Sequence, residues 1–256
     1  MFRAIAEALP QYDYVYLGDN SRAPYGNRSF DTVHQYTLEC VKWFFDMGCP
    51  LVILACNTAS AKALRTIQQK YLPQIDTTKR VLGVIRPSAE VIGNYTKTRE
   101  VGVLGTRGTV LSDSYKIEIG HFYPDVRVHQ KACPMWVPLI ENGEYDTEGA
   151  EFFVKKYLDE LMTAAPAIDT ILLACTHYPL LADKIKKYLP MGVQVVSQGE
   201  IVAASLGDYL QRHPEIDGVL TKNGTTRYFT TDDTAEFDNH ASIFRGMTVR
   251  SEHVSL

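Results

Sequence analysis

Two segments of this chain are near copies of each other, and they constrain its fold more than any other feature. Residues 51–58 and 171–177 each consist of a short apolar run, an Ala-Cys pair and then small polar residues. A continuous apolar run of this length is typical of a buried parallel strand. Cys56 and Cys175 are therefore predicted to lie just past the carboxyl end of a strand, where open α/β sheets place their chemistry.

A stretch with helical character follows each of these cysteines, from Ala59 to Tyr71 and from Pro179 to Tyr188. A helix that begins beside a sulfur atom directs its positive end and its free N–H groups at that atom, which favours the thiolate. Two such thiols, repeated in one chain, predict a site with one sulfur on each side of a small ligand.

The bulk composition is that of an ordinary water-exposed α/β protein. The chain has 256 residues, of which 45% are hydrophobic and 22% charged, enough for one large or two small domains. The net charge is −4 and the isoelectric point about 6.0, so we expect neither nucleic acid nor an anionic membrane as a partner. Because no apolar run reaches roughly 18 residues and the first residues lack a signal-peptide core, the sequence predicts no membrane span.

The five cysteines are odd in number and widely spaced, which is not the pattern of a disulfide framework and favours a reducing cytoplasm. Cys40 and Cys49 are interpreted as small buried hydrophobic residues. His121, His129 and Cys133 do not have the spacing of metal ligands, so no metal site is expected.

Predicted strands and helices alternate along most of the chain, which favours an α/β fold of parallel sheets with helices on both faces. Because the Cys units are duplicated, we expect two similar lobes that face each other. The tail from Arg227 onward is predicted to be less regular. The expected strands cover 13–17, 51–55, 81–85, 101–104, 126–130, 171–174 and 193–196, and the expected helices cover 2–9, 29–47, 59–71, 134–142, 147–164, 179–188 and 200–211.

Two opposed thiols suit the removal of a proton from one face of a carbon atom and its return on the other face. One sulfur must then be a thiolate and the other a thiol, so their environments must differ. This is the chemistry of a racemase or epimerase that needs no cofactor. A redox pair is the competing interpretation, although the Cys-X-X-Cys spacing common in such pairs is absent.

Several residues near the two cysteines are candidates for supporting roles. His177 could tune or protonate Cys175, or be a loop histidine bonded to a carbonyl group. Glu141 could place a carboxylate near the site, or be a solvated residue at a helix end. Two roles are possible for Asn57, Thr58 and Thr176, which could cap helices or contact a substrate carboxylate. Tyr25 and Gly26 could likewise either make a turn or contact the ligand.

Four motifs make the chain resemble the glutamate racemases of the cofactor-independent aspartate/glutamate racemase superfamily. They occur in order along nearly the whole chain, at residues 18–26, 55–60, 137–141 and 173–179. The resemblance implies two pseudo-symmetric lobes with the site in the cleft between them. It implies a first lobe of residues 1–85 plus 198–256, a second lobe of residues 86–197, and assembly as a homodimer.

The resemblance also implies roles for individual residues. Cys56 and Cys175 would be the two acid–base residues, and Glu141 and His177 would assist the second thiol. Glutamate would be the small-molecule substrate and no cofactor would be needed. The implied substrate contacts are Tyr25, Gly26, Asn57, Thr58, Thr176 and His177.

One departure from the family pattern concerns the first residues. Members open with a strand and an Asp-Ser-Gly-x-Gly-Gly loop, and this sequence begins inside the helix expected to follow that loop. The first hypothesis is conversion of L-glutamate to D-glutamate for peptidoglycan synthesis, and a racemase for aspartate or a related amino acid is the nearest alternative. The second hypothesis, from a different class, is a catalytically weak amino-acid-binding protein.

Overall fold

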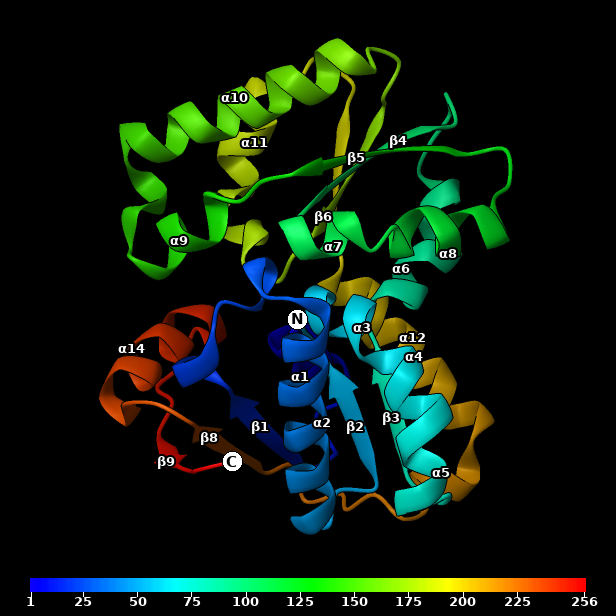
Figure 1. Cartoon of the computed structure of the whole chain (residues 1–256), viewed down its shortest axis with the longest axis vertical. Helices are drawn as coiled ribbons and strands as arrows, with labels where there is room; N and C mark the ends of the chain where they lie inside the picture. The colour runs from blue at the N-terminus through cyan, green and yellow to red at the C-terminus, as the bar shows by residue number, and fades with distance from the viewer.

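The computed structural model describes residues 1–256 and consists of two lobes, each with parallel strands and flanking helices (Figure 1). All strand pairs are parallel. The α/β class predicted from the alternating pattern is confirmed. The strands are β1 (Tyr14–Gly18), β2 (Leu51–Leu54), β3 (Arg80–Gly83), β4 (Glu100–Gly105), β5 (Arg127–Ala132), β6 (Thr170–Ala174), β7 (Gln194–Ser197), β8 (Thr226–Thr230) and β9 (Ser251–His253).

The helices join these strands and cover their faces. None of them has the length and apolar character needed to cross a membrane. The α-helices are α1 (Phe2–Ala8), α2 (Phe30–Asp46), α3 (Asn57–Lys62), α4 (Leu64–Thr66), α5 (Leu72–Ile75), α6 (Ile85–Val91), α7 (Arg107–Leu111), α8 (Ser114–Phe122), α9 (Trp136–Glu141), α10 (Glu148–Ala164), α11 (Ala182–Tyr188), α12 (Gly199–Arg212), α13 (Pro214–Asp217) and α14 (Thr234–Arg245).

The second lobe is built on one sheet with the strand order β5-β4-β6-β7. All five residues of β6 are buried, as a continuous apolar run predicts for a central parallel strand. Alternate side chains feed two cores: Ile171 and Leu173 pack with α9, α10 and α11, whereas Leu172 and Ala174 pack with α6 and α8. Burial on both faces holds the end of β6, and with it Cys175, in a rigid frame.

The first lobe contains two sheets that are not hydrogen-bonded to each other, β1-β8-β9 and β2-β3. Leu51 and Ile53 of β2 pack towards α1 and α12, and Val52 and Leu54 pack towards α2 and α3. This packing holds the carboxyl end of β2, where Cys56 follows. One edge of β1 and one edge of β2 have no strand partner.

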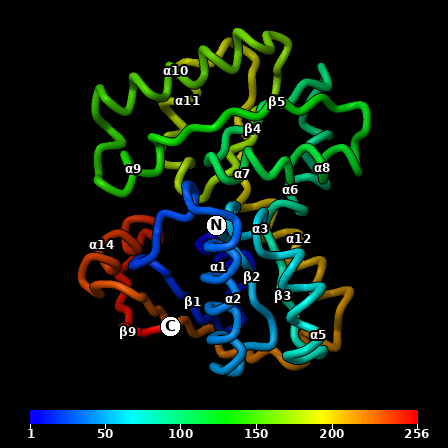
Figure 2. Tube along the Cα trace, viewed as in Figure 1, coloured from blue at the N-terminus to red at the C-terminus, as the bar shows by residue number.

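The chain passes from the first lobe to the second after β3 and returns after β7 (Figure 2). Strands β4 to β7 therefore form one sheet within residues 86–197, and the other strands lie outside that range. The predicted boundaries at 85/86 and 197/198 stay a prediction.

Local signals located several helix ends correctly. The side-chain oxygen of Ser29 accepts a hydrogen bond from the N–H of Thr32 and caps α2, at the start of the helix expected over 29–47. The chain leaves this helix through Gly48, whose φ of +85° favours glycine. The helix expected from Ala59 to Tyr71 is instead divided into α3, α4 and a π-helical turn, Ile67–Tyr71.

The expectation of a less regular tail was wrong. Residues 226–230 form β8, which pairs with β1 in register from Tyr14–Thr226 to Gly18–Thr230. After helix α14, β9 pairs with β8 and completes that sheet. The order of the tail comes from pairing with a strand some 200 residues earlier, a contact that local periodicity does not encode.

Candidate active site

The carboxyl ends of strands from both lobes face each other at the boundary between the lobes (Figure 1). Cys56 follows β2 and is the N-cap of α3, and Cys175 follows β6. Each lobe thus contributes one thiol, and all five cysteines of the chain are free. The position of both cysteines at strand ends agrees with the prediction from the sequence.

The surroundings of Cys56 act on its thiol in opposite directions. Burial raises its pKa, whereas hydrogen bonds from the N–H groups of Ala59 and Thr58 and from the Thr58 side chain lower it. Charge on Cys175 raises the pKa of Cys56 further. A negative charge on Cys175 would therefore favour a neutral thiol at Cys56.

Cys175 is supported by a cationic side chain. Cys175 is 7% exposed, and its Sγ lies 3.8 Å from Nδ1 of His177. Nε2 of His177 in turn hydrogen-bonds to Glu141 of α9. Burial opposes a charge on His177, but hydrogen bonds and charge from Cys175 and Glu141 raise its pKa to about 10. His177 is then an imidazolium at neutral pH, and its hydrogen bond holds the pKa of Glu141 below the ordinary value.

The chain after Cys175 differs from the prediction. A 3₁₀ turn, Tyr178–Leu181, comes first, and α11 begins only at Ala182. Thus no α-helix begins directly at this sulfur, in contrast to α3 at Cys56. The two thiols therefore have different neighbours, namely backbone N–H groups in the first lobe and an imidazolium–carboxylate pair in the second.

Replacing Glu141 with glutamine should lower the pKa of His177 and remove the pair's contribution to stability. Because the pKa of His177 rises on folding from 6.5 to about 10, its share is full below about pH 6.5 and is lost towards pH 10. The pKa of Glu141 falls on folding from 4.5, so its share is present above pH 4.5 and is lost in acid.

Urea unfolding at several pH values checks this prediction. We expect Glu141→Gln to be less stable than the original chain by about 1 kcal/mol between about pH 4.5 and 6.5, a modest value because the pair is partly exposed. The difference should fade near pH 10. Glu144→Gln, at an exposed position that forms no ion pair with histidine, is the control. A difference that grows from pH 6.5 to pH 10 would contradict the assignment.

Asn57 is part of a buried hydrogen-bond network that joins the lobes. It is 2% exposed, its Nδ2 donates to Oε1 of Gln198 at 2.7 Å, and its Oδ1 accepts from the hydroxyl of Tyr115 at 2.6 Å. Nε2 of Gln198 also donates to Ser88 and to the carbonyl of Val84. The side chain of Asn57 thus serves this network and caps no helix, and its contact with substrate stays a prediction.

Replacing Gln198 with leucine should destabilise the fold by about 2–4 kcal/mol. The change leaves the amide of Asn57 and the carbonyl of Val84 without these partners in a buried setting, and each unpaired group costs about 1–3 kcal/mol. Urea unfolding measures the effect. Gln35→Leu, at an exposed position of α2, is the control and should change stability by less than about 0.5 kcal/mol. Equal stabilities of the two variants would refute the role given to this network.

Thr58 and Gly26 lie where the first lobe touches the start of α7. The Thr58 hydroxyl is 2.9 Å from that of Thr106 and 3.4 Å from that of Thr109. A Cβ atom on Gly26 would lie 2.9 Å from the Cβ of Thr106, so this close approach requires glycine. These predicted site residues are brought together with the end of β4, and their substrate contacts stay a prediction.

Tyr25 and Thr176 have partners within the protein. The Tyr25 hydroxyl donates to Asp19, which also pairs with Arg22, and burial raises the pKa of Tyr25. The Thr176 hydroxyl is 3.5 Å from Nδ1 of His177. Thr176 therefore lies beside His177, the side chain that contacts Cys175. The Tyr25 side chain instead organises the loop that carries Gly26.

Sequence reasoning missed three contributors to this region. Gln198 and Thr106 each follow a strand, β7 and β4, so their place at a strand end was a usable signal. Tyr16 of β1 is half-buried, and desolvation of its hydroxyl together with the charge of Glu141 raises its pKa, with Cys56 adding to the effect. No local pattern marks Tyr16, because its neighbours come from three distant segments.

Comparison with known proteins agrees with this architecture. A model of the Asp/Glu/Hydantoin racemase family matches residues 1–206. The chain belongs to this family. It is 37% identical to the glutamate racemase of Persephonella marina over 257 residues, which cover 100% of this chain and 92% of that protein.

Solved structures place this racemase-family chain among the glutamate racemases in fold. A glutamate racemase of Bacillus anthracis superposes with a TM-score of 0.88 at 34% identity, covering 99% of this chain and 91% of that one. The glutamate racemase of Francisella tularensis, solved in complex with D-glutamate, superposes with a TM-score of 0.86 at 27% identity and covers 99% and 92%. The family fold therefore extends over essentially the whole chain.

Proposed function

We propose that this protein interconverts L- and D-glutamate, with Cys56 and Cys175 as the two acid–base groups. The observation that carries the proposal is one free thiol at a strand end of each lobe, each with its own supporting groups. Its relatives in Persephonella marina, Bacillus anthracis and Francisella tularensis are named glutamate racemases, which supports glutamate as the substrate.

The reaction needs two proton transfers and no net redox change. A thiolate removes the α-proton, so that the Cα–H bond breaks, an S–H bond forms and the electron pair stays on the substrate. The opposite thiol then gives its proton to the other face of the carbon and becomes a thiolate. Because the two sulfurs have exchanged roles, the reverse reaction follows the same path, and atoms and charges balance without a cofactor.

The two thiols have the unequal surroundings that an exchange of roles between them needs. The imidazolium of His177, 3.8 Å from Sγ of Cys175, stabilises a negative sulfur there. Burial and the neighbouring charge favour the neutral form of Cys56. When the proton positions reverse, the N–H groups of Thr58 and Ala59 support a thiolate at Cys56.

Substrate binding is assigned to the groups that surround the two thiols. The backbone of Gly26 and Asn57, together with the side chains of Thr58, Thr176 and His177, provides N–H and O–H donors suited to the substrate's carboxylates. Tyr25 acts by holding the loop of Gly26 through Asp19. In the cell, the proposed homodimer would act in the cytoplasm and supply D-glutamate for peptidoglycan.

The direct test incubates the purified protein with L-glutamate and follows the circular dichroism signal of the amino acid over time. L-aspartate is tested in parallel. Decay of the glutamate signal to zero, as racemisation requires, supports the proposal. Faster turnover of aspartate would replace the substrate and keep the chemistry. Glutamate binding by calorimetry without turnover would favour the second candidate, an amino-acid-binding protein. The unpaired edges of β1 and β2 motivate this candidate, because the strand and loop with which family members open have no counterpart at these edges.

A further inference from the structure

Helix α14 belongs to the first lobe but contacts the His177–Glu141 pair of the second lobe. It connects β8 to β9, and Figure 1 shows it beside the boundary between the lobes, near α9. The ring of Phe244 lies 5.9 Å from that of His177, centroid to centroid, with an interplanar angle of 83°. One turn earlier, His240 lies near enough to Glu141 for its charge to contribute to lowering the pKa of that carboxyl group.

These two α14 residues are four positions apart and so share one face of the helix. That face lies against the His177–Glu141 pair, whose side chains remain partly exposed with α14 in place, as does Phe244 itself. An aromatic ring in near-perpendicular contact with the imidazole shields part of one side of it and limits its rotation. The contact therefore favours the ring orientation in which His177 meets both Glu141 and Cys175.

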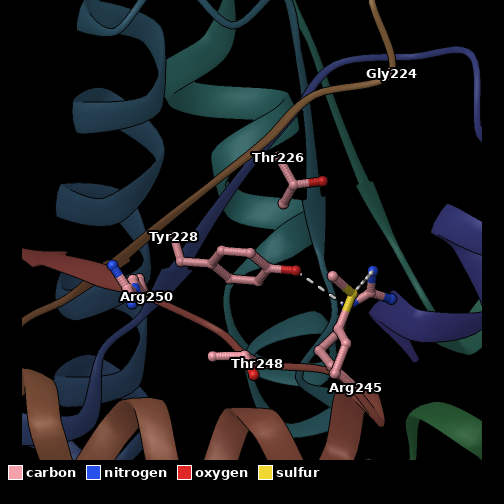
Figure 3. A pocket seen from close by; sticks show the side chains of 7 residues that line it. Gly224, Thr226, Tyr228, Arg245, Thr248 and Arg250 are labelled. Atoms are coloured by element: carbon pink, nitrogen blue, oxygen red, sulfur yellow. Dashed lines mark hydrogen bonds between the residues drawn. The ribbon is translucent and has the colours of Figure 1, made fainter.

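The last turn of α14 is anchored to the first lobe by Arg245. Its Nε donates to the hydroxyl of Tyr228 on β8 at 3.0 Å, and its guanidinium lies 4.8 Å from the ring centroid of Phe2. Figure 3 shows this arginine with Tyr228 at the edge of a hollow of about 590 Å³. Gly246, with φ of +69°, ends the helix directly afterwards. Phe244 is thus presented from a fixed position rather than from a free end.

We propose that Phe244 is a positioning residue, whose ring holds the His177 imidazole between Glu141 and Cys175 from across the lobe boundary. The two-thiol mechanism proposed above gives this contact its purpose, so the catalytic part of the inference rests on that function. The packing of α14 then couples the arrangement of the lobes to the support of the second thiol.

Several titratable groups surround His177 and enter any measured pH effect. Cys175 and Glu141 contact it directly, and the Thr176 hydroxyl adds a neutral partner. From α14, His240 acts on Glu141, and from β1, the buried hydroxyl of Tyr16 lies near the same carboxylate. The test below therefore observes the His177 ring itself and does not rely on the pH profile of activity alone.

The experiment compares Phe244→Ala, Phe244→Leu and Phe244→Tyr with Ile243→Ala, a control at the adjacent, 58% exposed position. Racemisation kinetics give kcat and KM, and NMR of histidine-labelled protein gives the titration of His177 without substrate. We expect Phe244→Ala to lower kcat by about tenfold to a hundredfold with little change in KM. We also expect it to shift the titration of His177, because the ring changes both the hydration of the imidazole and its contacts with Glu141 and Cys175. The tyrosine variant and the Ile243→Ala control should match the original chain.

Each outcome decides the proposal. An unchanged His177 titration in Phe244→Ala would overturn it, whether or not kcat falls, because the ring would then act elsewhere. If the alanine variant fails to fold, the leucine variant, which keeps volume but removes the ring, carries the same two measurements. If the original chain does not racemise glutamate, the proposed function fails, and the NMR titration still decides whether Phe244 positions His177.

Discussion

Cys56→Ala and Cys175→Ala are each expected to lower the rate of D-glutamate formation by at least about 10²–10⁴-fold. Each thiol serves one face of the α-carbon, and each lies in a different lobe, so neither can replace the other. The folds should survive, because each change removes only the thiol group and leaves the methyl group of alanine in its place. Circular dichroism in the far ultraviolet checks folding, and optical rotation checks turnover.

Cys49→Ala provides the matched control for these variants. Cys49 follows α2, burial also raises the pKa of its thiol, and its side chain forms no hydrogen bond with a predicted site residue. We expect this variant to keep the full rate. Near-normal D-glutamate formation by Cys56→Ala or by Cys175→Ala would refute the two-base mechanism, even if the protein proved to be a racemase.

An extended chain that carries a strand and an Asp-Ser-Gly-x-Gly-Gly loop ahead of Met1 is expected to racemise glutamate about 10²-fold faster. The reason lies in the first lobe, where β1 pairs only with β8 and β2 pairs only with β3. A parallel strand between their unpaired edges would join the two sheets into one. Its loop would then bring a carboxylate to the end of β2, where Cys56 exchanges its proton.

The position of the first residue is compatible with this addition. Figure 1 shows the N-terminus near the boundary between the lobes, at the start of α1. Met1 is half-buried, and burial lowers the pKa of its amino group. The extended chain should also unfold at higher urea concentration, because each added ladder bond contributes about 0.5–1.5 kcal/mol.

An extension of equal length made of glycine and serine is the control for that experiment, and it should change neither rate nor stability. The rates of the two extended chains decide the matter. If both turn over glutamate equally fast, the specific strand and loop are dispensable, and the interpretation of the unpaired edges is wrong.

Several features were readable from the sequence because they depend on local periodicity. The apolar runs before Cys56 and Cys175 predicted buried parallel strands, and β2 and β6 occupy those positions. Since parallel strands place their carboxyl ends at one edge of a sheet, the location of both thiols followed without any structure. Ser29 and Gly48 lie at the two ends of α2, the first through its side-chain hydrogen bond and the second through its positive φ.

Other features were decided only by the tertiary structure, because they depend on contacts between distant segments. The sequence alone determined a parallel α/β chain with a thiol after each of two matched strands. The folded chain decided that Asn57 bonds to Gln198, 141 positions away, and that Glu141 meets His177 across 36 positions. It also brought Phe244 of α14 against His177. Such pairs are set by how whole elements pack, and no local pattern records which side chains that packing brings together.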